Sequence, residues 1–373
     1  YFLIFASVFV LCFNLQAQDT AYARQVIADL SSPAMYGRGA EHRGDSIAAE
    51  YLRSEMRRLG VKPLVPDYYQ YYTYPVYIFE QPISLSINGH SLDPYSQFRI
   101  VRPSIGHSQS SKSDFVRSVD GIQVVSVEKL DTYGPLSYSS ADEPFSVEVL
   151  SSMLPHKVRK MSLSIPFSHQ TEYCSQNVCG IVHGEVDSIV IFAAHYDHCG
   201  SMGSQTIFPG AHDNASGVAA VLDLARLAAA HQPHYTQVFL LFSGEEAGIR
   251  GSHFASDHPL VDYSKVKLFC NIDMFCGGDD GLMVFNADSP ETQPYFNRLK
   301  SFNEQHHLAK EIRPRKNSPN SDHYYFSRYV PAIFLLTMGQ PYGGYHDPAD
   351  TCQACGLSHY ADYLTLILQL IAQ

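Results

Sequence analysis

Short, fully apolar runs that alternate with helical segments constrain the fold of this chain more than any other feature. From residue 175 onward the apolar runs are SIVIFAAH, QVFLLF, VKLFCNID and PAIFLLT, with helical segments such as GVAAVLDLARLAAA among them. Strands that read as continuous apolar runs are buried on both faces, and strands that alternate with helices are typical of α/β proteins. We therefore predict an α/β sheet that is covered by helices on both faces.

The first half of the chain has a different pattern. Apolar residues recur at helical spacing over residues 23–30 and 47–59, and the loop YGRGAEHRGD lies between these segments. From about residue 68 to residue 172, short alternating runs such as VYIF and IQVVSV indicate strands. We expect one domain over residues 18–373, with a strand-rich middle portion at about 68–172.

Composition narrows the functional class. Of the 373 residues, 45% are hydrophobic, which is enough for a large core. There are 26 Lys and Arg residues against 37 Asp and Glu residues, a formal net charge of -11, and no basic run. Proteins that bind nucleic acid concentrate positive charge on one surface. We therefore predict no nucleic-acid partner.

The N-terminal residues have the character of an export signal. Residues 1–13 are apolar, and Leu15, Gln16 and Ala17 after them fit a signal-peptidase cleavage site. We expect a signal peptide over residues 1–17 and export to the periplasm or the extracellular space. The apolar run is shorter than the roughly 18 residues that a spanning helix needs, so we expect no stable membrane anchor.

Cysteine spacing offers candidate disulfides. Close cysteines pair in oxidising compartments, and the close pairs are Cys174 with Cys179 and Cys352 with Cys355. For the second pair, plain thiols are the alternative. Removal of Cys12 with the signal peptide leaves an odd number of cysteines, so at least one stays unpaired or pairs between chains.

Acidic and histidine side chains follow four of the apolar runs. They are His195 and Asp197 after IVIFAA, Glu245 and Glu246 after VFLLF, Asp273 after VKLFCNI, and His346 after AIFLLT, while Asp213 precedes a helical segment. Each residue alone has an ordinary explanation, such as helix capping by Asp213. Open α/β sheets gather their binding sites beyond the carboxyl ends of the strands. The joint pattern therefore predicts that these side chains converge.

The predicted cluster has the donors of a metal centre. Glu245 and Glu246 place two like charges at the edge of a core, which is costly unless a proton or a cation relieves the repulsion. Two imidazoles and three carboxylates suit zinc, with cobalt or manganese as substitutes. One catalytic zinc uses three protein ligands, so five favour two ions that share a carboxylate. Such a pair binds a water whose pKa falls to roughly 7, and Glu245 would be its base.

Six motifs resemble a known enzyme family. In order they are HYDH, GAHDNASG, GEEAGIRGS, NIDM, SDHYYF and YHDPADT, and they resemble the zinc-dependent exopeptidases that include aminopeptidase Y, bacterial leucyl aminopeptidases, glutamate carboxypeptidases and glutaminyl cyclases. The resemblance implies a three-layer zinc-exopeptidase fold with a central mixed, largely parallel sheet. By the same resemblance the metal ligands are His195, Asp213, Glu246, Asp273 and His346, with Asp213 bridging, Glu245 as general base and Asp197 orienting His195.

The function that this resemblance implies is a secreted two-zinc aminopeptidase acting on peptides with a free N-terminus. The alternatives are a glutaminyl cyclase with one zinc and a non-catalytic binding protein on the same scaffold. The chain has no tryptophan and its GAHDNASG segment is closer to the hydrolases, which favours the aminopeptidase. His212 replaces an acid that many relatives carry, and Asp322, His323 and Tyr324 match the family without an assigned role.

Overall fold

The computed structural model describes residues 19–101, 116–136, 145–340 and 342–372. The predicted signal peptide at residues 1–17 lies outside these residues. Within them, no helix combines the length and the apolar composition that crossing a bilayer requires.

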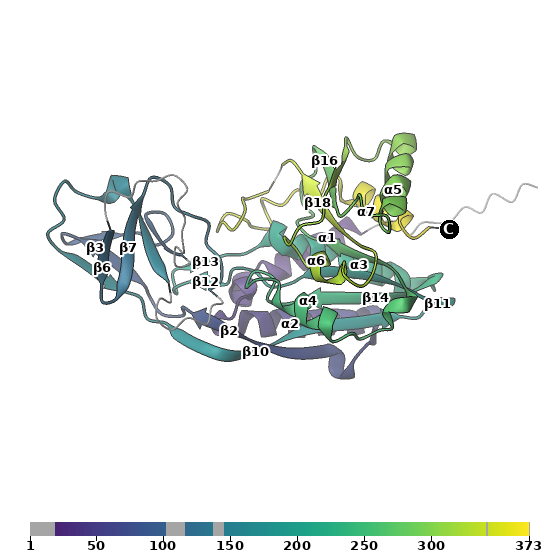
Figure 1. Ribbon diagram of the computed structural model, residues 1–373, viewed down its shortest axis with the longest axis horizontal. Coiled ribbons are helices and arrows are strands. Elements are labelled where there is room, and N and C mark those ends of the chain that lie inside the picture. The colour runs from purple at the N-terminus through teal and green to yellow at the C-terminus, as the bar shows by residue number, and fades with distance from the viewer. Residues whose placement is uncertain (1–18, 102–115, 137–144, 341, 373) are drawn as a thin grey trace, which may run out of the picture.

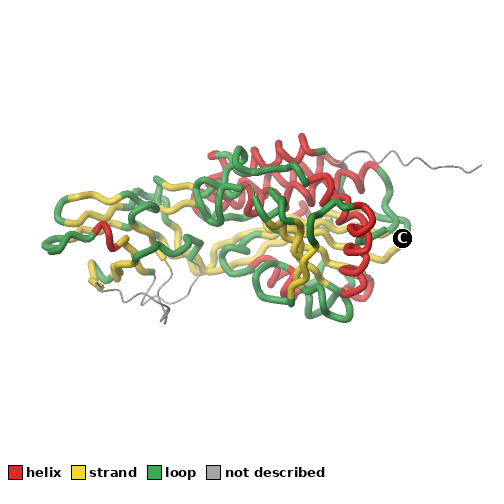
Figure 2. Tube along the Cα trace, turned by 90° about the horizontal axis from the view of Figure 1, so that it is seen from above, coloured by secondary structure: helices red, strands yellow, loops and turns green. Residues whose placement is uncertain are grey.

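A nine-stranded mixed sheet forms the centre of the fold (Figures 1 and 2). Its order is β1 (Lys62–Pro63), β10 (Ser168–Val182), β14 (Tyr235–Phe242), β11 (Val186–His195), β15 (Val266–Ile272), β18 (Ala332–Met338), β16 (Gly281–Phe285) and β17 (Ile312–Arg315), with β2 (Tyr69–Ile78) also paired to β10. The strands β14, β11, β15 and β18 are parallel, whereas β10 pairs antiparallel with β14 and β16 with β18. Ala193 lies opposite both Leu240 and Asn271, so the carboxyl ends of these strands reach the same edge.

Helices cover both faces of this sheet. The helices α1 (Thr20–Leu30), α2 (Gly44–Leu59), α3 (Ser216–Ala230), α5 (Gln293–His306) and α7 (Tyr360–Gln369) contribute to the core on one face, and α4 (Arg250–Asp257) and α6 (His323–Phe326) to the core on the other. Alternate residues of β11 point to the two cores: Val190 and Phe192 to the first, Ile189 and Ile191 to the second. The predicted three-layer α/β fold with a central mixed sheet is confirmed.

The first helix illustrates how the local sequence sets these elements. The buried residues of α1 are Ala23, Val26, Ile27 and Leu30, which recur at helical spacing. At its N-terminus the Asp19 carboxylate accepts a hydrogen bond of 2.9 Å from the Tyr22 amide. This contact satisfies one of the amide groups that the first turn of a helix leaves free.

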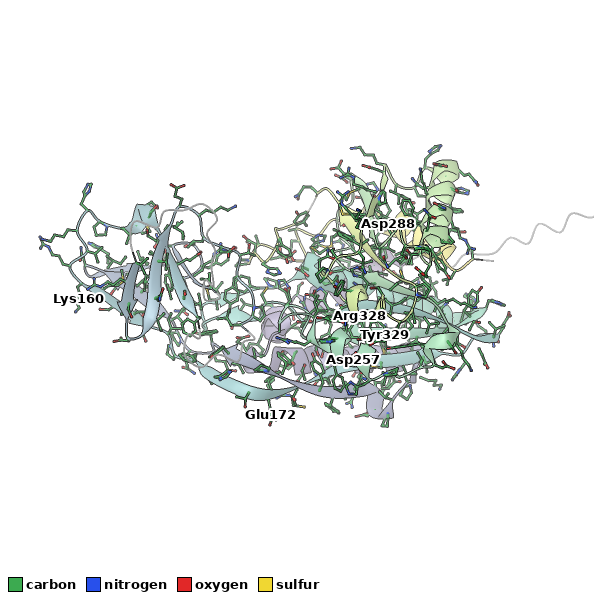
Figure 3. All side chains as sticks on the ribbon, viewed as in Figure 1. Lys160, Glu172, Asp257, Asp288, Arg328 and Tyr329 are labelled. Carbon is green, nitrogen blue, oxygen red and sulfur yellow. A yellow bond between two sulfur atoms is a disulfide. The ribbon has the colours of Figure 1, made fainter. Side chains whose placement is uncertain are left out.

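A second group of strands projects from the main body, at the left of Figure 1. A three-stranded sheet contains β4 (His90–Leu92), β3 (Ser84–Ile87) and β9 (Met161–Ser164), and a four-stranded sheet contains β5 (Phe98–Val101), β8 (Ser146–Leu150), β7 (Ile122–Val127) and β6 (Val116–Val119). We call the described residues between 84 and 164 the strand lobe. Figure 3 shows Lys160 at the far end of this lobe, away from Asp257 on α4.

The strand lobe has a hydrophobic core of its own. Phe98, Val124 and Val147 are fully buried in it, together with Met202 and Phe208 from the loop after β11. That loop also carries the short strands β12 (Ser201–Met202) and β13 (Thr206–Ile207). The lobe is therefore packed against the loop that follows His195.

The disulfide prediction is wrong. Among the described cysteines, Cys276 and Cys355 form a disulfide with a Cα–Cα distance of 5.5 Å, while Cys174, Cys179 and Cys352 are free. Cys174 and Cys179 both lie on the extended strand β10, which at about 3.3 Å per residue separates them by roughly 16 Å. Disulfides require a Cα–Cα distance of about 4.4–6.8 Å. Proximity in sequence therefore misled the prediction.

Candidate active site

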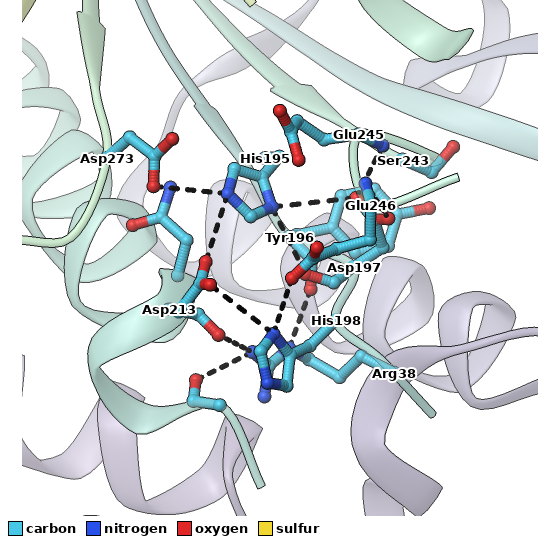
Figure 4. A network of polar contacts seen from close by, with 12 residues as sticks. Arg38, His195, Tyr196, Asp197, His198, Asp213, Ser243, Glu245, Glu246 and Asp273 are labelled. Atoms are coloured by element: carbon cyan, nitrogen blue, oxygen red, sulfur yellow. Dashed lines mark hydrogen bonds and ion pairs between the residues drawn. The ribbon is translucent and has the colours of Figure 1, made fainter. Parts of the chain in front are cut away.

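The predicted site residues meet at the carboxyl edge of the central sheet, and Figure 4 labels all of them except His346. His195 is the last residue of β11, Asp273 follows β15, and Glu245 and Glu246 lie in the turn after β14. His346 lies in the loop after β18. Asp213 lies in the short turn Ala211–Ala215 that leads into α3, where the peptide bond to Asn214 is cis.

Five of these side chains form two contiguous groups around Asp213. His195 Nε2 lies 3.3 Å from Asp213 Oδ1 and 3.2 Å from Asp273 Oδ1. His346 Nε2 lies 3.3 Å from Asp213 Oδ2 and 2.9 Å from Glu246 Oε2. All five residues are buried. The two carboxylate oxygens of Asp213 thus face different imidazoles, with one more acid on each side.

Hydrogen bonds fix which nitrogen of each imidazole faces the cluster. His346 Nδ1 lies 2.7 Å from the backbone oxygen of Tyr133, and His195 Nδ1 lies 3.2 Å from the backbone oxygen of Asp197. A histidine that donates through Nδ1 presents the lone pair of Nε2, which is the arrangement of metal ligands. Tyr133 belongs to the strand lobe, and no pattern in the sequence indicated this contact.

Asp197 holds two loops together. Its carboxylate accepts hydrogen bonds from the amides of Glu245 at 3.1 Å and Glu246 at 3.2 Å. The same carboxylate lies 3.7 Å from His195 Nδ1. Asp197 therefore sets the position of the Glu245–Glu246 turn relative to the His195 ring and has no direct place in the cluster of donor atoms.

The Glu245 carboxyl faces the open side of the site. It lines a cleft of about 1190 Å³, together with Glu246 and His346. Burial raises the pKa of Glu245 well above its usual value; the nearby His195 opposes this shift and the Glu246 charge adds to it. A glutamate so placed can accept a proton from a molecule in the cleft.

Two buried groups that the sequence did not single out hold the Asp213 turn. The Asp350 carboxylate accepts hydrogen bonds from the amides of His212 at 2.9 Å and Asp213 at 3.1 Å. The fully buried Arg38 guanidinium donates to backbone oxygens that include those of Gly210 at 2.7 Å and Asp213 at 3.2 Å. Both residues lay inside motifs already recognised, GRGAEHRGD and YHDPADT.

The residues without an assigned role separate into different environments. Ser321 Oγ donates a 2.7 Å hydrogen bond to Asp273 Oδ2, which orients that carboxylate. Asp322 is buried nearby, and burial raises its pKa to about 7. The His323 ring lies among the aromatic rings of Phe285 and Phe334, so burial lowers its pKa to about 3.

His212 does not join the cluster. Its Nδ1 accepts a 3.2 Å hydrogen bond from the Cys276 amide, and its ring stacks on Tyr342 with a centroid distance of 4.5 Å. Burial lowers its pKa to about 4, so the imidazole is neutral at pH 7. The departure from the motif of the relatives at this position therefore leaves the set of five donors intact.

His198 and Cys199 were missed by the sequence analysis, and both lie at the cluster. His198 Nδ1 is 2.8 Å from Glu246 Oε1, and Cys199 Sγ is 3.8 Å from the same oxygen. The motif HYDH contained a signal for His198. Cys199 beside it could not be identified from the sequence, because isolated cysteines are common core residues.

The donor atoms fit divalent metal ions. Among the described residues, two groups bring their nitrogen, oxygen and sulfur atoms within 4.8 Å of one another, one with His195, Asp213 and Asp273 and the other with His198, Cys199, Glu246 and His346. His346 Nε2 is buried without a hydrogen-bond partner in the described part of the chain. Imidazole, carboxylate and thiol together form a donor set that zinc prefers.

Comparison with protein families and curated proteins gives consistent matches. The sequence model of Peptidase family M28 matches residues 177–371. Aminopeptidase Y of Saccharomyces cerevisiae is 26% identical over 195 residues, which cover 48% of this chain and 35% of that protein. An aminopeptidase of Pseudomonas aeruginosa is 31% identical over 111 residues, which cover 29% of this chain and 19% of that protein. The matches therefore span well under two thirds of these relatives.

Solved structures share the fold over nearly the whole chain. A zinc aminopeptidase from Bacillus subtilis superposes with a TM-score of 0.65 at 16% identity and covers 95% of this chain and 94% of its own. A glutaminyl cyclase from Bacteroides thetaiotaomicron, bound to N-acetylhistamine, gives a TM-score of 0.55 at 13% identity over 95% and 98%. At this level of identity the two structures establish a common fold.

Proposed function

Because the chain belongs to Peptidase family M28, we propose that it is an exported metallo-aminopeptidase that hydrolyses the first peptide bond of peptides with a free N-terminus. The observation that carries the proposal is the position of Asp213, with one oxygen 3.3 Å from His195 Nε2 and the other 3.3 Å from His346 Nε2. A carboxylate shared between two donor groups suits a pair of ions. The matches to two aminopeptidases support the choice of substrate.

The proposed ligands divide between two zinc ions. His195, Asp213 and Asp273 would hold one ion, and Asp213, Glu246 and His346 the other. When bound, such ions polarise the substrate carbonyl and make water a nucleophile near neutral pH. The chain itself fixes the five donors through Asp197, Ser321, Asp350 and the backbone oxygen of Tyr133.

Glu245 is the proposed general base and acid. It faces the cleft beside the ligand Glu246, and its backbone amide is held by Asp197. In the reaction its carboxylate takes a proton from the attacking water and then delivers this proton to the leaving amine.

The cleft is large enough for a peptide chain. Its volume of about 1190 Å³ exceeds the range of roughly 300–1,000 Å³ that is usual for small-molecule sites. One wall contains Glu245, Glu246 and His346. The two glutamate carboxylates suit the positive charge of a free N-terminus. The strand lobe forms the facing wall, so we treat residues 18–373 as one catalytic domain.

A Glu245→Gln variant tests the proposal. The zinc content should stay at the wild-type level, because Glu245 is outside the ligand set. Turnover of aminoacyl-anilides should fall by roughly 10²- to 10⁴-fold, the usual contribution of acid–base catalysis. The matched control is Glu304→Gln, an exposed glutamate on α5, which should leave turnover unchanged. Unchanged turnover in Glu245→Gln would contradict the proposed role.

Product analysis separates the aminopeptidase from the glutaminyl cyclase. Peptides with N-terminal glutamine would lose ammonia if the protein were a cyclase and would release a free residue if it were an aminopeptidase. The five proposed ligands form two groups that share Asp213. This arrangement favours two ions and therefore the hydrolase. Chelation should abolish the release of free residues, and added zinc should restore it.

A further inference from the structure

Two buried side chains, His198 and Cys199, lie in the second donor group beside Glu246 and His346. They have no role in the ligand set proposed above. His198 is fully buried and Cys199 is 1% exposed. Their donor atoms lie within 4.8 Å of each other and of those of Glu246 and His346. Among the residues that the structure describes, the first donor group contains His195, Asp213 and Asp273 and no further donor.

The contacts of these side chains leave their donor atoms available. Cys199 Sγ lies 3.8 Å from Glu246 Oε1, and His198 Nδ1 lies 2.8 Å from Glu246 Oε1 and 3.9 Å from Asp213 Oδ2. Within the described chain, neither nitrogen of His198 has a hydrogen-bond partner of good geometry, and neither has His346 Nε2. Cys199 Sγ also lies 3.8 Å from the backbone oxygen of Tyr133. Buried polar atoms without partners are costly, and a cation that binds one nitrogen of each imidazole would reduce that cost for His198 and His346.

The backbone makes room for the His198 ring. Gly210 has a φ of +62°, a conformation that favours glycine, and a Cβ at this position would lie 2.5 Å from the ring. The His198 amide also donates a 3.4 Å hydrogen bond to the backbone oxygen of Arg38. The ring and the neighbouring thiol are therefore held in place against the turn that carries Asp213.

We propose that Cys199 and His198 are ligands of the second ion, which is then bound through sulfur as well as nitrogen and oxygen. This inference rests on the proposed function, because it assumes that the centre binds metal. The Cys199 thiol releases its proton to solvent when the ion binds. Together with the shared Asp213, the four donors of this group would give the second ion five protein ligands, which fills that position, whereas three protein donors leave the first position open.

The inference makes the two positions chemically different. Thiolate ligands favour softer ions such as zinc or cadmium, and carboxylate-rich sites accept manganese or cobalt more readily. The second position should therefore retain zinc during mild chelation, and the first should exchange it. Substrate and water then meet the open position, next to Glu245.

Cobalt titration of the chelated full-length protein tests the inference, because cobalt bound to thiolate has a charge-transfer band in the near ultraviolet. The wild-type protein should show this band on cobalt binding, and Cys199→Ser should lose it while keeping the visible cobalt bands. The control Cys179→Ser replaces another buried free cysteine, on β10, and should keep the band. In Cys199→Ser, the zinc affinity of one of the two positions should fall by at least about 10- to 100-fold. This is the loss that follows when a residue that only orients a metal ligand is replaced, and loss of a ligand itself should cost no less.

The possible results separate the two proposals. A wild-type protein that binds two cobalt ions without the thiolate band would overturn the role of Cys199 and leave the proposed function standing. The same holds if Cys199→Ser or Cys199→Ala keeps the band. A protein that binds no cobalt and has no peptidase activity would overturn both. Absence of the band in the wild type overturns the inference without any variant, and Cys199→Ala takes the place of Cys199→Ser if that variant fails to fold.

Discussion

The α/β body and the strand lobe form facing walls of one cleft, and they differ in chemistry. The body contributes ionisable groups, Glu245, Glu246 and His346, at the ends of parallel strands. The lobe contributes Val116, Val125 and Val127 on the face of a sheet, together with charged side chains such as Lys129 and Glu148, and none of these belongs to the donor groups of the body. Strand ends in a packed sheet hold side chains in fixed positions, as catalysis requires. Under the proposed function, the body would perform the reaction and the lobe would contact the peptide.

The largest expected effect tests whether the body alone carries the chemistry. Asp213→Ala removes a carboxylate that faces both His195 and His346. Both proposed ions would lose a ligand, so metal content should fall sharply and activity should drop by more than about 10⁴-fold, beyond the contribution of acid–base catalysis. Metal analysis and aminoacyl-anilide assays measure these losses. An Asp187→Asn control, which changes an exposed acid, should retain both.

Two phenylalanine truncations compare the stability of the two regions. Phe192→Ala opens a cavity in the core of the body, and Phe98→Ala opens one in the lobe; both side chains are fully buried. Each should lower the free energy of unfolding of its own region by about 3–5 kcal/mol. During denaturation, Phe192→Ala should release metal earlier, whereas Phe98→Ala should leave metal release unchanged. Equal shifts in both variants would show that body and lobe unfold as one unit.

The disulfide is a feature of the body and should stabilise it. Cys276 and Cys355 are 79 residues apart, so the crosslink restricts the unfolded chain between the end of β15 and the segment before α7. The Cys276→Ser, Cys355→Ser double variant should lose about 2–4 kcal/mol of unfolding free energy. Thermal unfolding with and without reductant measures the loss. The free thiol variant Cys352→Ser is the control and should respond to reductant as the wild type does.

The body could be predicted from the sequence because its signals are local. Apolar runs followed at once by acids or histidines identify strands and the edge at which their ends meet, and the motif order supported the same residues. His198 was signalled by its motif but not recognised. Arg38 and Asp350 act on the backbone of distant loops, and such contacts leave no periodic trace in a sequence.

The lobe shows what the sequence could not supply. Its runs indicated strands, but the pairing of β7 with β8 and of β3 with β9 joins segments that are far apart in the chain. The contact of the Tyr133 carbonyl with His346 uses a backbone atom, which any residue could provide. The correct disulfide likewise depends on how two loops meet in space. Each of these features follows from tertiary packing, which local patterns do not encode.

The smallest expected effect tests the peptide-binding role of the lobe. Val125 lies opposite Val116 on the sheet face that lines the cleft, whereas its neighbour Val124 is buried in the lobe core. A peptide that covers Val125 gains about 1.5 kcal/mol from its burial, so Val125→Ser should lower kcat/KM for longer peptides by roughly 10-fold. Aminoacyl-anilides, which end near the reactive carbonyl, should be cleaved as before. Gln123→Ala on the exposed part of the same strand is the control. An equal loss for anilides and peptides would mean that the lobe acts on the catalytic centre itself, through the Tyr133 contact, and would remove the distinction between the two walls.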